Sequence, residues 1–202
     1  LFLLISIFFI CTLPLGSWAA ELSLRQANNG STDISVLVGD EIEVELWIES
    51  SSEQLSGAAI FLSFDESVFA IADRDRQPGT AGIQPFAPGQ FLRNGEVYRN
   101  TLLNPDDPAA NAAGAQLDYS VVRGIDQGSG LVASFRLRAL APTRNSSIRI
   151  DESGSRETRI FLPDGSQRAF RFITPMHISV RGITIEGLPP TLVLARGQAD
   201  TT

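Results

Sequence analysis

Two aspartate pairs carry the side chains of this chain that are best suited to bind a metal ion. Asp73 and Asp75 are separated by one residue, and Asp106 and Asp107 are adjacent. Carboxylate oxygens from one loop are ligands that calcium prefers in proteins. Neither pair has the spacing of an EF-hand loop, and aspartates near proline also form ordinary turns. The sequence leaves calcium binding and turn formation as alternatives, and it predicts no other cofactor.

The residue types that hydrolases use are scarce. The chain has one histidine, His177, one cysteine, Cys11, and no lysine among its 16 basic residues. A Ser-His-Asp or Cys-His mechanism would depend on His177 alone, and a Cys/His zinc site would lack ligands. Schiff-base chemistry is excluded because lysine is missing, and no Gly-x-Ser-x-Gly sequence is present. We therefore expect a protein without enzymatic activity.

The first 19 residues indicate where the protein acts. Residues 1–11 are uncharged and mostly apolar, Pro14 follows, and Ser17 and Ala19 place small residues before a cleavage point. This layout is typical of a secretory signal peptide. The apolar run before Pro14 is shorter than the roughly 20 residues of a spanning helix. We predict a signal peptide over 1–19, with a retained membrane anchor as the alternative, and a secreted or cell-surface bacterial protein.

The remaining composition sets the size and partners of the folded part. About 180 residues remain after the signal peptide, which is enough for one domain with a full core. The net charge of −7 argues against a nucleic-acid partner, since such a partner needs a basic surface. No cysteine follows Cys11, so the domain must hold together without disulfides. We place the domain at 20–186 and interpret 187–202 as a linker or the start of another module.

The elements that position the candidate residues are strands. Ile42, Val44, Leu46 and Ile48 alternate with glutamates and Trp47, and this period of two predicts a half-buried strand. Similar runs recur along the chain, and no amphipathic helix of ten or more residues is apparent. We expect an all-β sandwich of about nine strands. The expected strand regions are 41–49, 57–64, 68–71, 96–102, 116–122, 131–139, 148–151, 158–162 and 170–185.

Three stretches in order resemble the cohesin domain. They are VGDEIEV at 38–44, LSGAAIFLSFDESVF at 55–69 and GLVASFRLRA at 130–139, and the resemblance extends over about residues 22–186. It implies a nine-stranded jelly-roll sandwich related to certain carbohydrate-binding modules. It also implies a non-catalytic module on or outside the cell that binds a dockerin-type protein through an exposed sheet face instead of a pocket.

The residues that we expect on such a binding face are polar or aromatic and lie on strands. Their alternative role is to keep the outer face soluble, and Trp47 in particular suits cross-strand packing. The candidates are Glu43, Glu45, Trp47, Tyr119, Arg136 and Arg138.

Two other functions remain open at this point. A carbohydrate-binding module would bind polysaccharide through exposed coplanar aromatic rings, and Trp47, Tyr98 and Tyr119 are the tryptophan and tyrosine residues beyond residue 19. A structural adhesin or surface-layer unit would need no discrete ligand. In all of these interpretations, contact with a membrane occurs only through an uncleaved segment 1–19.

Overall fold

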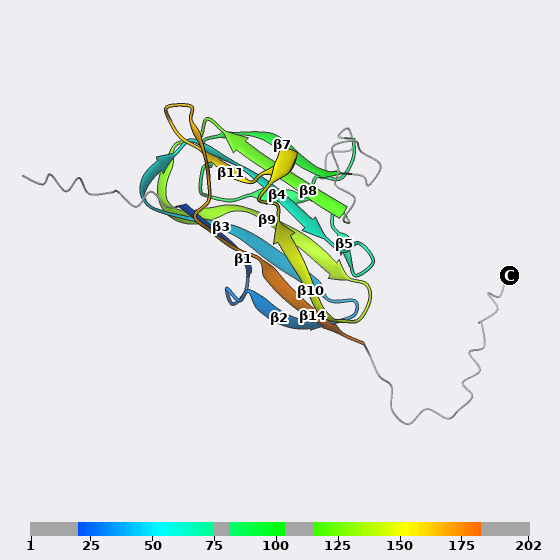
Figure 1. Cartoon of the computed structure of the whole chain (residues 1–202). Helices are drawn as coiled ribbons and strands as arrows, with labels where there is room; N and C mark the ends of the chain where they lie inside the picture. Colours follow the sequence, from blue (N-terminus) through cyan, green and yellow to red (C-terminus); the bar gives the residue numbers. More distant parts are fainter. Residues whose placement is uncertain (1–19, 75–80, 104–114, 183–202) are drawn as a thin grey trace, which may run out of the picture.

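The computed structural model describes residues 20–74, 81–103 and 115–182, which form a two-layer β-sandwich (Figure 1). The predicted signal peptide, the predicted linker at 187–202, and Asp75, Asp106 and Asp107 lie outside the described residues. Among the residues described, no helix is long and apolar enough to cross a membrane.

One layer is built around two long antiparallel strands, and we call it the β3 sheet. Its strand order is β13-β1-β3-β9-β5, and β6 also pairs with β9. The bounds are β1 Ala20–Gln26, β3 Glu41–Leu55, β5 Phe69–Ile71, β6 Phe86–Pro88, β9 Asp126–Ala139 and β13 Phe172–Thr174.

The other layer, which we call the β4 sheet, has the order β12-β11-β4-β10-β14-β2, and β8 pairs with both β4 and β7. Strand β14 runs parallel to β2 and antiparallel to β10. The bounds are β2 Asp33–Leu37, β4 Gly57–Phe64, β7 Glu96–Leu103, β8 Ala115–Val122, β10 Thr143–Ile150, β11 Arg159–Phe161, β12 Gln167–Ala169 and β14 Met176–Arg181.

The core lies between the two sheets and follows from the alternation in the sequence. The even-numbered residues of β3 from Ile42 to Ile48 are buried, and so are those of β4 from Ala58 to Phe64. Phe86 joins the layers, since its ring centroid lies 5.1 Å from that of Tyr119 and 5.4 Å from that of Phe135. A fully buried valine, leucine, isoleucine or phenylalanine side chain contributes about 1.5–3 kcal/mol to stability. Burial of these apolar faces therefore holds the two sheets together.

The sequence Val38-Gly39-Asp40 forms a tight turn between β2 and β3. Gly39 has a φ of +95°, which glycine adopts without a steric penalty. A carboxylate oxygen of Asp40 accepts the backbone N–H of Leu37 at 2.8 Å. The backbone N–H of Gly39 and the backbone carbonyl of Asp40 both bond to Ala139, at 2.8 and 2.9 Å. The turn therefore fixes the start of β3 against the end of β9.

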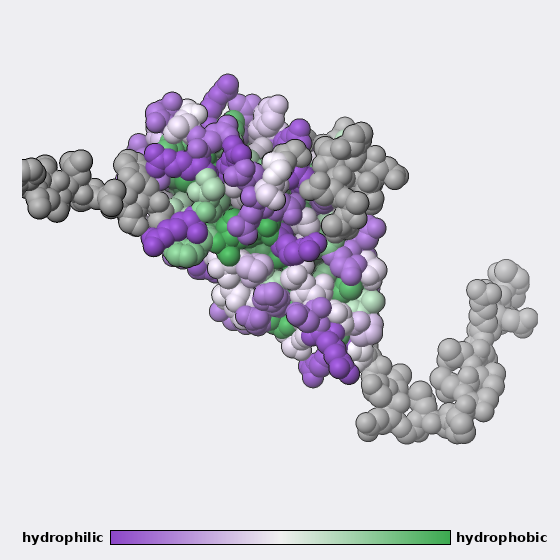
Figure 2. Space-filling model, in the orientation of Figure 1, coloured by the Kyte–Doolittle hydropathy of each residue, from purple (hydrophilic) through white to green (hydrophobic). Residues whose placement is uncertain are grey.

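The expected all-β sandwich is confirmed. The described residues contain one 3-10 turn, Gly154–Arg156, and no α-helix. They contain the strands β1 to β14, of which β5, β6, β11, β12 and β13 have three residues each. The nine-stranded jelly-roll topology stays a prediction. Polar side chains cover most of the face in Figure 2, and apolar ones form a small area near its middle.

Candidate docking faces

The outer face of the β3 sheet brings together most of the residues predicted for binding. Glu43, Glu45 and Trp47 project from β3, and Arg136 and Arg138 project from the neighbouring β9. Glu43 lies directly opposite Arg136. These side chains are exposed or half-buried, as the alternation predicts.

The charges on this face are largely paired with one another. Glu43 accepts hydrogen bonds from Ser134 Oγ at 2.8 Å, from Arg136 Nε at 3.2 Å and from the Arg74 guanidinium. Burial alone would raise the pKa of Glu43, but these donors outweigh it and hold the pKa below its ordinary value of 4.5. Arg136 also lies 3.6 Å from Glu41. Arg138 has no side-chain partner within the described residues.

Trp47 is also engaged within its own face. Its indole N–H donates to Glu45 Oε2 at 2.7 Å, and the Arg25 guanidinium carbon lies 5.4 Å from the ring centroid. Arg25 in turn lies 2.5 Å from Glu49. The ring of Trp47 therefore contributes to cross-strand packing and to a cation–π contact, in which Arg25 lies over one face of the ring.

The prediction that Tyr119 belongs to an exposed binding face is wrong. Tyr119 is 1% exposed and lies in the core between the sheets. Burial raises the pKa of Tyr119 to about 12. The reason is the pleat of β8, because Tyr119 points to the same side as Leu117 and Val121. That shared parity was visible in the sequence.

Each outer face of the sandwich carries charges of both signs. The outer face of the β3 sheet carries Glu21, Glu41, Glu43, Glu45 and Glu49, with Arg25, Arg74, Arg136 and Arg138. The outer face of the β4 sheet carries Arg99, Arg149, Arg156, Arg159 and Arg181, with Asp33, Glu96, Asp118, Asp151 and Glu157. On the β4 sheet, Arg149 and Arg181 have no side-chain partner within the described residues.

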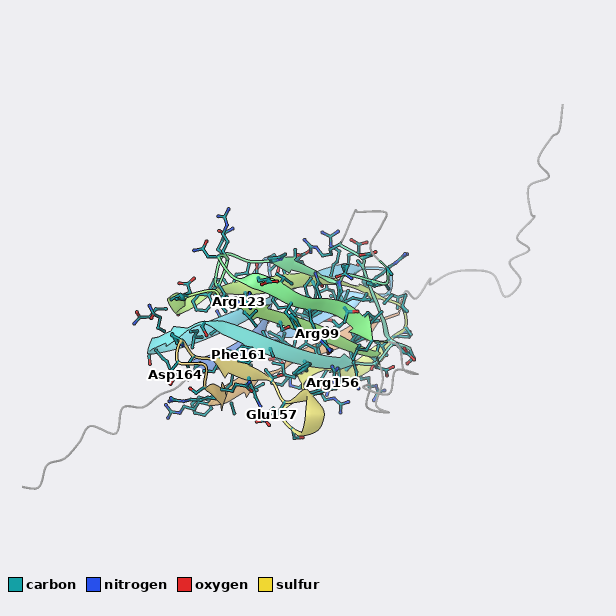
Figure 3. The ribbon with its side chains drawn as sticks, turned by 90° about the horizontal axis from the view of Figure 1, so that it is seen from above. Arg99, Arg123, Arg156, Glu157, Phe161 and Asp164 are labelled. Atoms are coloured by element: carbon teal, nitrogen blue, oxygen red, sulfur yellow. The ribbon has the colours of Figure 1, made fainter. Side chains whose placement is uncertain are left out.

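A connecting segment crosses part of the β4 sheet. We call Asp151–Thr158, which joins β10 to β11, the strap. Arg156 of the strap is 3% exposed, and its guanidinium lies 2.5 Å from Asp118 as an ion pair rather than an aligned hydrogen bond. It lies 3.2 Å from Asp151 and 5.1 Å from the centroid of the Phe61 ring. Figure 3 shows Arg156 and Arg99 on this face.

Asp118, beneath the strap, is a buried carboxyl with two cationic neighbours. Burial raises the pKa of Asp118 above its ordinary value of 3.8, although Arg156 and Arg99 both oppose the shift. Arg99 reaches the same carboxyl from β7 at 3.3 Å. This cluster could not be predicted from the sequence, because Asp118 alternates with the apolar residues Leu117 and Tyr119, a pattern that favours a solvent-facing side chain.

Beside the strap, the β4 sheet has a shallow polar depression of about 490 Å³. Its lining residues are Phe64, Asp65, Asn145, Ser146, Ser147, Arg149 and His177. Within the described part of the chain, the side chains of Asn145, Ser147, Arg149 and His177 make no hydrogen bond or ion pair. This part of the surface therefore offers donors that the protein itself does not use.

The geometry does not favour the other chemistries considered. No hydrogen bond joins the side chain of His177 to Ser147 or to Asp65 among the described contacts. Across the described ranges, no three His, Cys, Asp or Glu side chains gather in a metal-binding group. Asp73 is exposed and accepts the backbone N–H of Gln84 at 3.2 Å. Calcium binding stays a prediction, because the other three candidate ligands lie outside the described residues.

Comparison of sequences finds no match, whereas comparison of structures finds a shared fold. No protein-family model matches this sequence, and no curated protein matches it. A non-cellulosomal cohesin from the archaeon Archaeoglobus fulgidus matches with a TM-score of 0.51 at 13% identity, over 83% of this chain and 94% of that one.

Cohesins solved together with dockerins match equally well. A type II cohesin in a cohesin–X-dockerin complex from Acetivibrio cellulolyticus gives a TM-score of 0.57 at 17% identity, over 80% of this chain and 99% of that one. A type I cohesin in a complex from Clostridium thermocellum gives 0.51 at 10% identity, over 82% and 96%. The predicted resemblance is therefore confirmed at the level of the fold: this chain has the sandwich of cohesin domains.

Proposed function

We propose that this chain is an exported, non-catalytic module that binds a dockerin-type protein through the outer face of its β4 sheet. The observation that carries the proposal is the set of unused polar side chains around Arg149 and His177 on an open sheet. The fold supports it, because cohesins of this architecture have been solved in complexes with dockerins.

We choose between the two faces by comparing how many of their polar side chains already have a partner within the protein. On the β3 sheet, Glu43, Arg136 and Trp47 have partners within the sheet. A protein that docks on the β3 sheet must either break these contacts, which costs free energy, or leave them in place and gain few new hydrogen bonds. On the β4 sheet, the free donors can bind without such a loss. The predicted set on the β3 sheet, Glu43, Glu45, Trp47, Arg136 and Arg138, remains the alternative face.

The unpaired arginines of the β4 sheet indicate the partner's chemistry. Arg149 and Arg181 favour aspartate and glutamate side chains on the partner's surface, since complementary charge speeds association and fixes orientation. We expect the affinity to fall as salt concentration rises, because exposed charges are screened over about 10 Å at 0.1 M salt.

A displayed library of dockerin modules tests the proposal. We expect selection with this chain to enrich dockerin modules with acidic surfaces, with Kd values of about 10 µM or lower. Arg149→Glu should weaken binding at least about tenfold, while Arg138→Glu, on the other face, should leave it within about twofold. Recovery of no dockerin module would refute the function, and the reverse ranking of the two variants would assign binding to the β3 sheet.

Two natural reporters locate the bound partner independently of mutation. His177 is the one histidine of the chain, so its imidazole proton resonances report on the β4 sheet without ambiguity. With Trp18 replaced by phenylalanine, Trp47 is the one tryptophan, and its fluorescence reports on the β3 sheet. Binding should shift the His177 resonances and leave the Trp47 emission unchanged.

The alternative functions have weaker support. In the described part of the chain, Tyr119 is buried, the ring of Trp47 lies against Arg25, and Tyr98 is 72% exposed on β7, so these rings form no common platform. Retention on insoluble polysaccharide that is lost in Trp47→Ala would favour carbohydrate binding. Filaments of the purified chain would favour a structural role.

Export is the second part of the proposal. Strand β1 begins at Ala20, which pairs with Ser50 of β3, so cleavage after Ala19 would leave the whole strand intact. We expect mass spectrometry of the secreted protein to find Ala20 at the N-terminus. Recovery of the intact chain from the membrane would support the anchor alternative.

A further inference from the structure

Several hydrogen-bond donors line the depression on the β4 sheet. Ser147 of β10 lies directly opposite His177 of β14, and Arg149 is two residues along β10 from Ser147. Residues two apart on a strand project from the same face, about 7 Å apart. A guanidinium, a hydroxyl and an imidazole therefore border the same hollow, which Asn145 also lines.

These donors face carboxylates that are already hydrogen-bonded elsewhere. In the hollow, Asp65 Oδ1 accepts the backbone N–H of Ser67 at 2.9 Å and the Ser67 hydroxyl at 2.6 Å. The two hydrogen bonds hold the pKa of Asp65 below its ordinary value of 3.8. No ion pair joins Asp65 to Arg149 among the described contacts. Arg149 therefore has no acidic partner in the hollow, whereas Asp65 already accepts two hydrogen bonds.

A second hollow continues the first across β14 to β2. It has a volume of about 340 Å³ and shares Asn145 and His177 with the first. Arg144 also lines it, again without a side-chain partner in the described residues. Its one carboxylate, Asp33, accepts the Thr32 hydroxyl at 3.0 Å. The same pattern of unpaired cation and hydrogen-bonded anion thus occurs twice along one groove.

We propose that Arg149, Ser147 and His177 form a pocket for a carboxylate, namely a glutamate or aspartate side chain of the docked protein partner. The planar guanidinium of arginine binds both oxygens of a carboxylate at once, and the hydroxyl and imidazole N–H donate from the neighbouring strands. This inference rests on the proposed docking function, and it names the anchor point within the β4 sheet.

The test uses the whole chain and small probes in place of the partner. The Hε1 resonance of His177 is followed by NMR during titration with two probes that differ in charge: N-acetylglutamic acid α-amide, whose side-chain carboxylate is free, and N-acetylglutamine α-amide, its neutral isostere. Inorganic phosphate is the third probe, and pH and ionic strength are held constant. We expect a saturable shift with the glutamate probe and none with the glutamine probe.

Matched variants assign the effect to the pocket. Arg149→Gln should weaken the glutamate probe at least about tenfold, since it removes the bidentate donor. Arg138→Gln replaces an equally exposed arginine on the other sheet and should leave the titration unchanged. Because both positions are exposed, both variants should fold, and circular dichroism checks this.

Each result bears on the proposal. An unmoved Hε1 resonance, an equal response to glutamine, or a titration that survives Arg149→Gln would overturn it. Tighter binding of phosphate than of the glutamate probe would overturn the assignment to a protein carboxylate. If the pocket fails these tests while Arg149→Glu still weakens a selected dockerin module, the docking function stands without this anchor. If the probes bind and no dockerin module does, the docking function fails.

Discussion

Replacing Arg156 by methionine should destabilise the folded protein by about 3 kcal/mol at pH 7. The side chains of Arg156 and Asp118 are 3% and 2% exposed, so the pair is fully buried, and removing one partner from such a pair costs about 3–5 kcal/mol. Arg99 stays 3.3 Å from the same carboxyl, which favours the lower end of that range. A loss of 3 kcal/mol reduces the folding equilibrium constant more than about 100-fold.

The loss should depend on pH in a defined direction. Burial already raises the pKa of Asp118, and Arg156 is the first of the groups that oppose the shift. Without Arg156 the folded-state pKa rises further above the unfolded value. A carboxyl with a raised folded pKa contributes stability that is present at low pH and lost as the pH rises through that pKa. The variant should therefore gain stability relative to the wild type as the pH falls from 7 towards 5.

Urea unfolding followed by circular dichroism, at pH 7 and at pH 5, measures both effects, with an unchanged m-value as the check on two-state behaviour. Arg123→Met is the matched control, because Arg123 and its partner Glu96 have side chains that are 83% and 64% exposed; it should cost less than about 1 kcal/mol at both pH values. Adding Asp118→Asn to Arg156→Met should recover at least half of the loss. A loss that is the same at both pH values, or no recovery, would refute the reasoning.

Three further predictions concern the β3 sheet and the core. Glu43→Gln should flatten the acid side of the stability curve, since the lowered pKa of Glu43 contributes stability above pH 4.5 that is lost as the pH falls further; thermal melts from pH 6 to pH 3 measure this. Tyr119→Ala should cost about 3–5 kcal/mol in urea unfolding, as for other buried aromatic residues, and a loss below about 1 kcal/mol would contradict its place in the core. Arg25→Ala should shift the emission of Trp47 to longer wavelength, with a stability loss of no more than about 1 kcal/mol; an unchanged spectrum would argue against the cation–π contact.

The regular strands were predictable because a strand places successive side chains on opposite faces. The alternation at 41–49 and 133–139 correctly separated the core residues of β3 and β9 from their outer charges. It failed at Leu131, because a bulge pairs Leu131 with Trp47 and buries Val132 instead. Strands β1 and β2 were missed, since polar residues interrupt their short apolar patterns. Their pairing is also non-local: β2 lies beside β14, at the other end of the chain.

The candidate site was only partly predictable. Parity predicted that Glu43 and Arg136 face outward on their strands, and only the pairing of β3 with β9 placed them opposite each other. The error at Tyr119 came from weighting its aromatic chemistry above its parity with Leu117 and Val121. The depression lined by Arg149 and His177 was not predicted from the sequence, because the two residues belong to strands whose pairing the sequence does not specify.

By itself, the amino-acid sequence determined which apolar side chains of the long strands face the core, because the period of two and the hydrophobic effect act within a few residues. Only the tertiary structure decided which strands became neighbours, that the strap would bury Arg156 against Asp118, and which polar groups found partners. Those outcomes depend on contacts between segments far apart in the chain, where the free energy of pairing is settled by the packing of whole sheets.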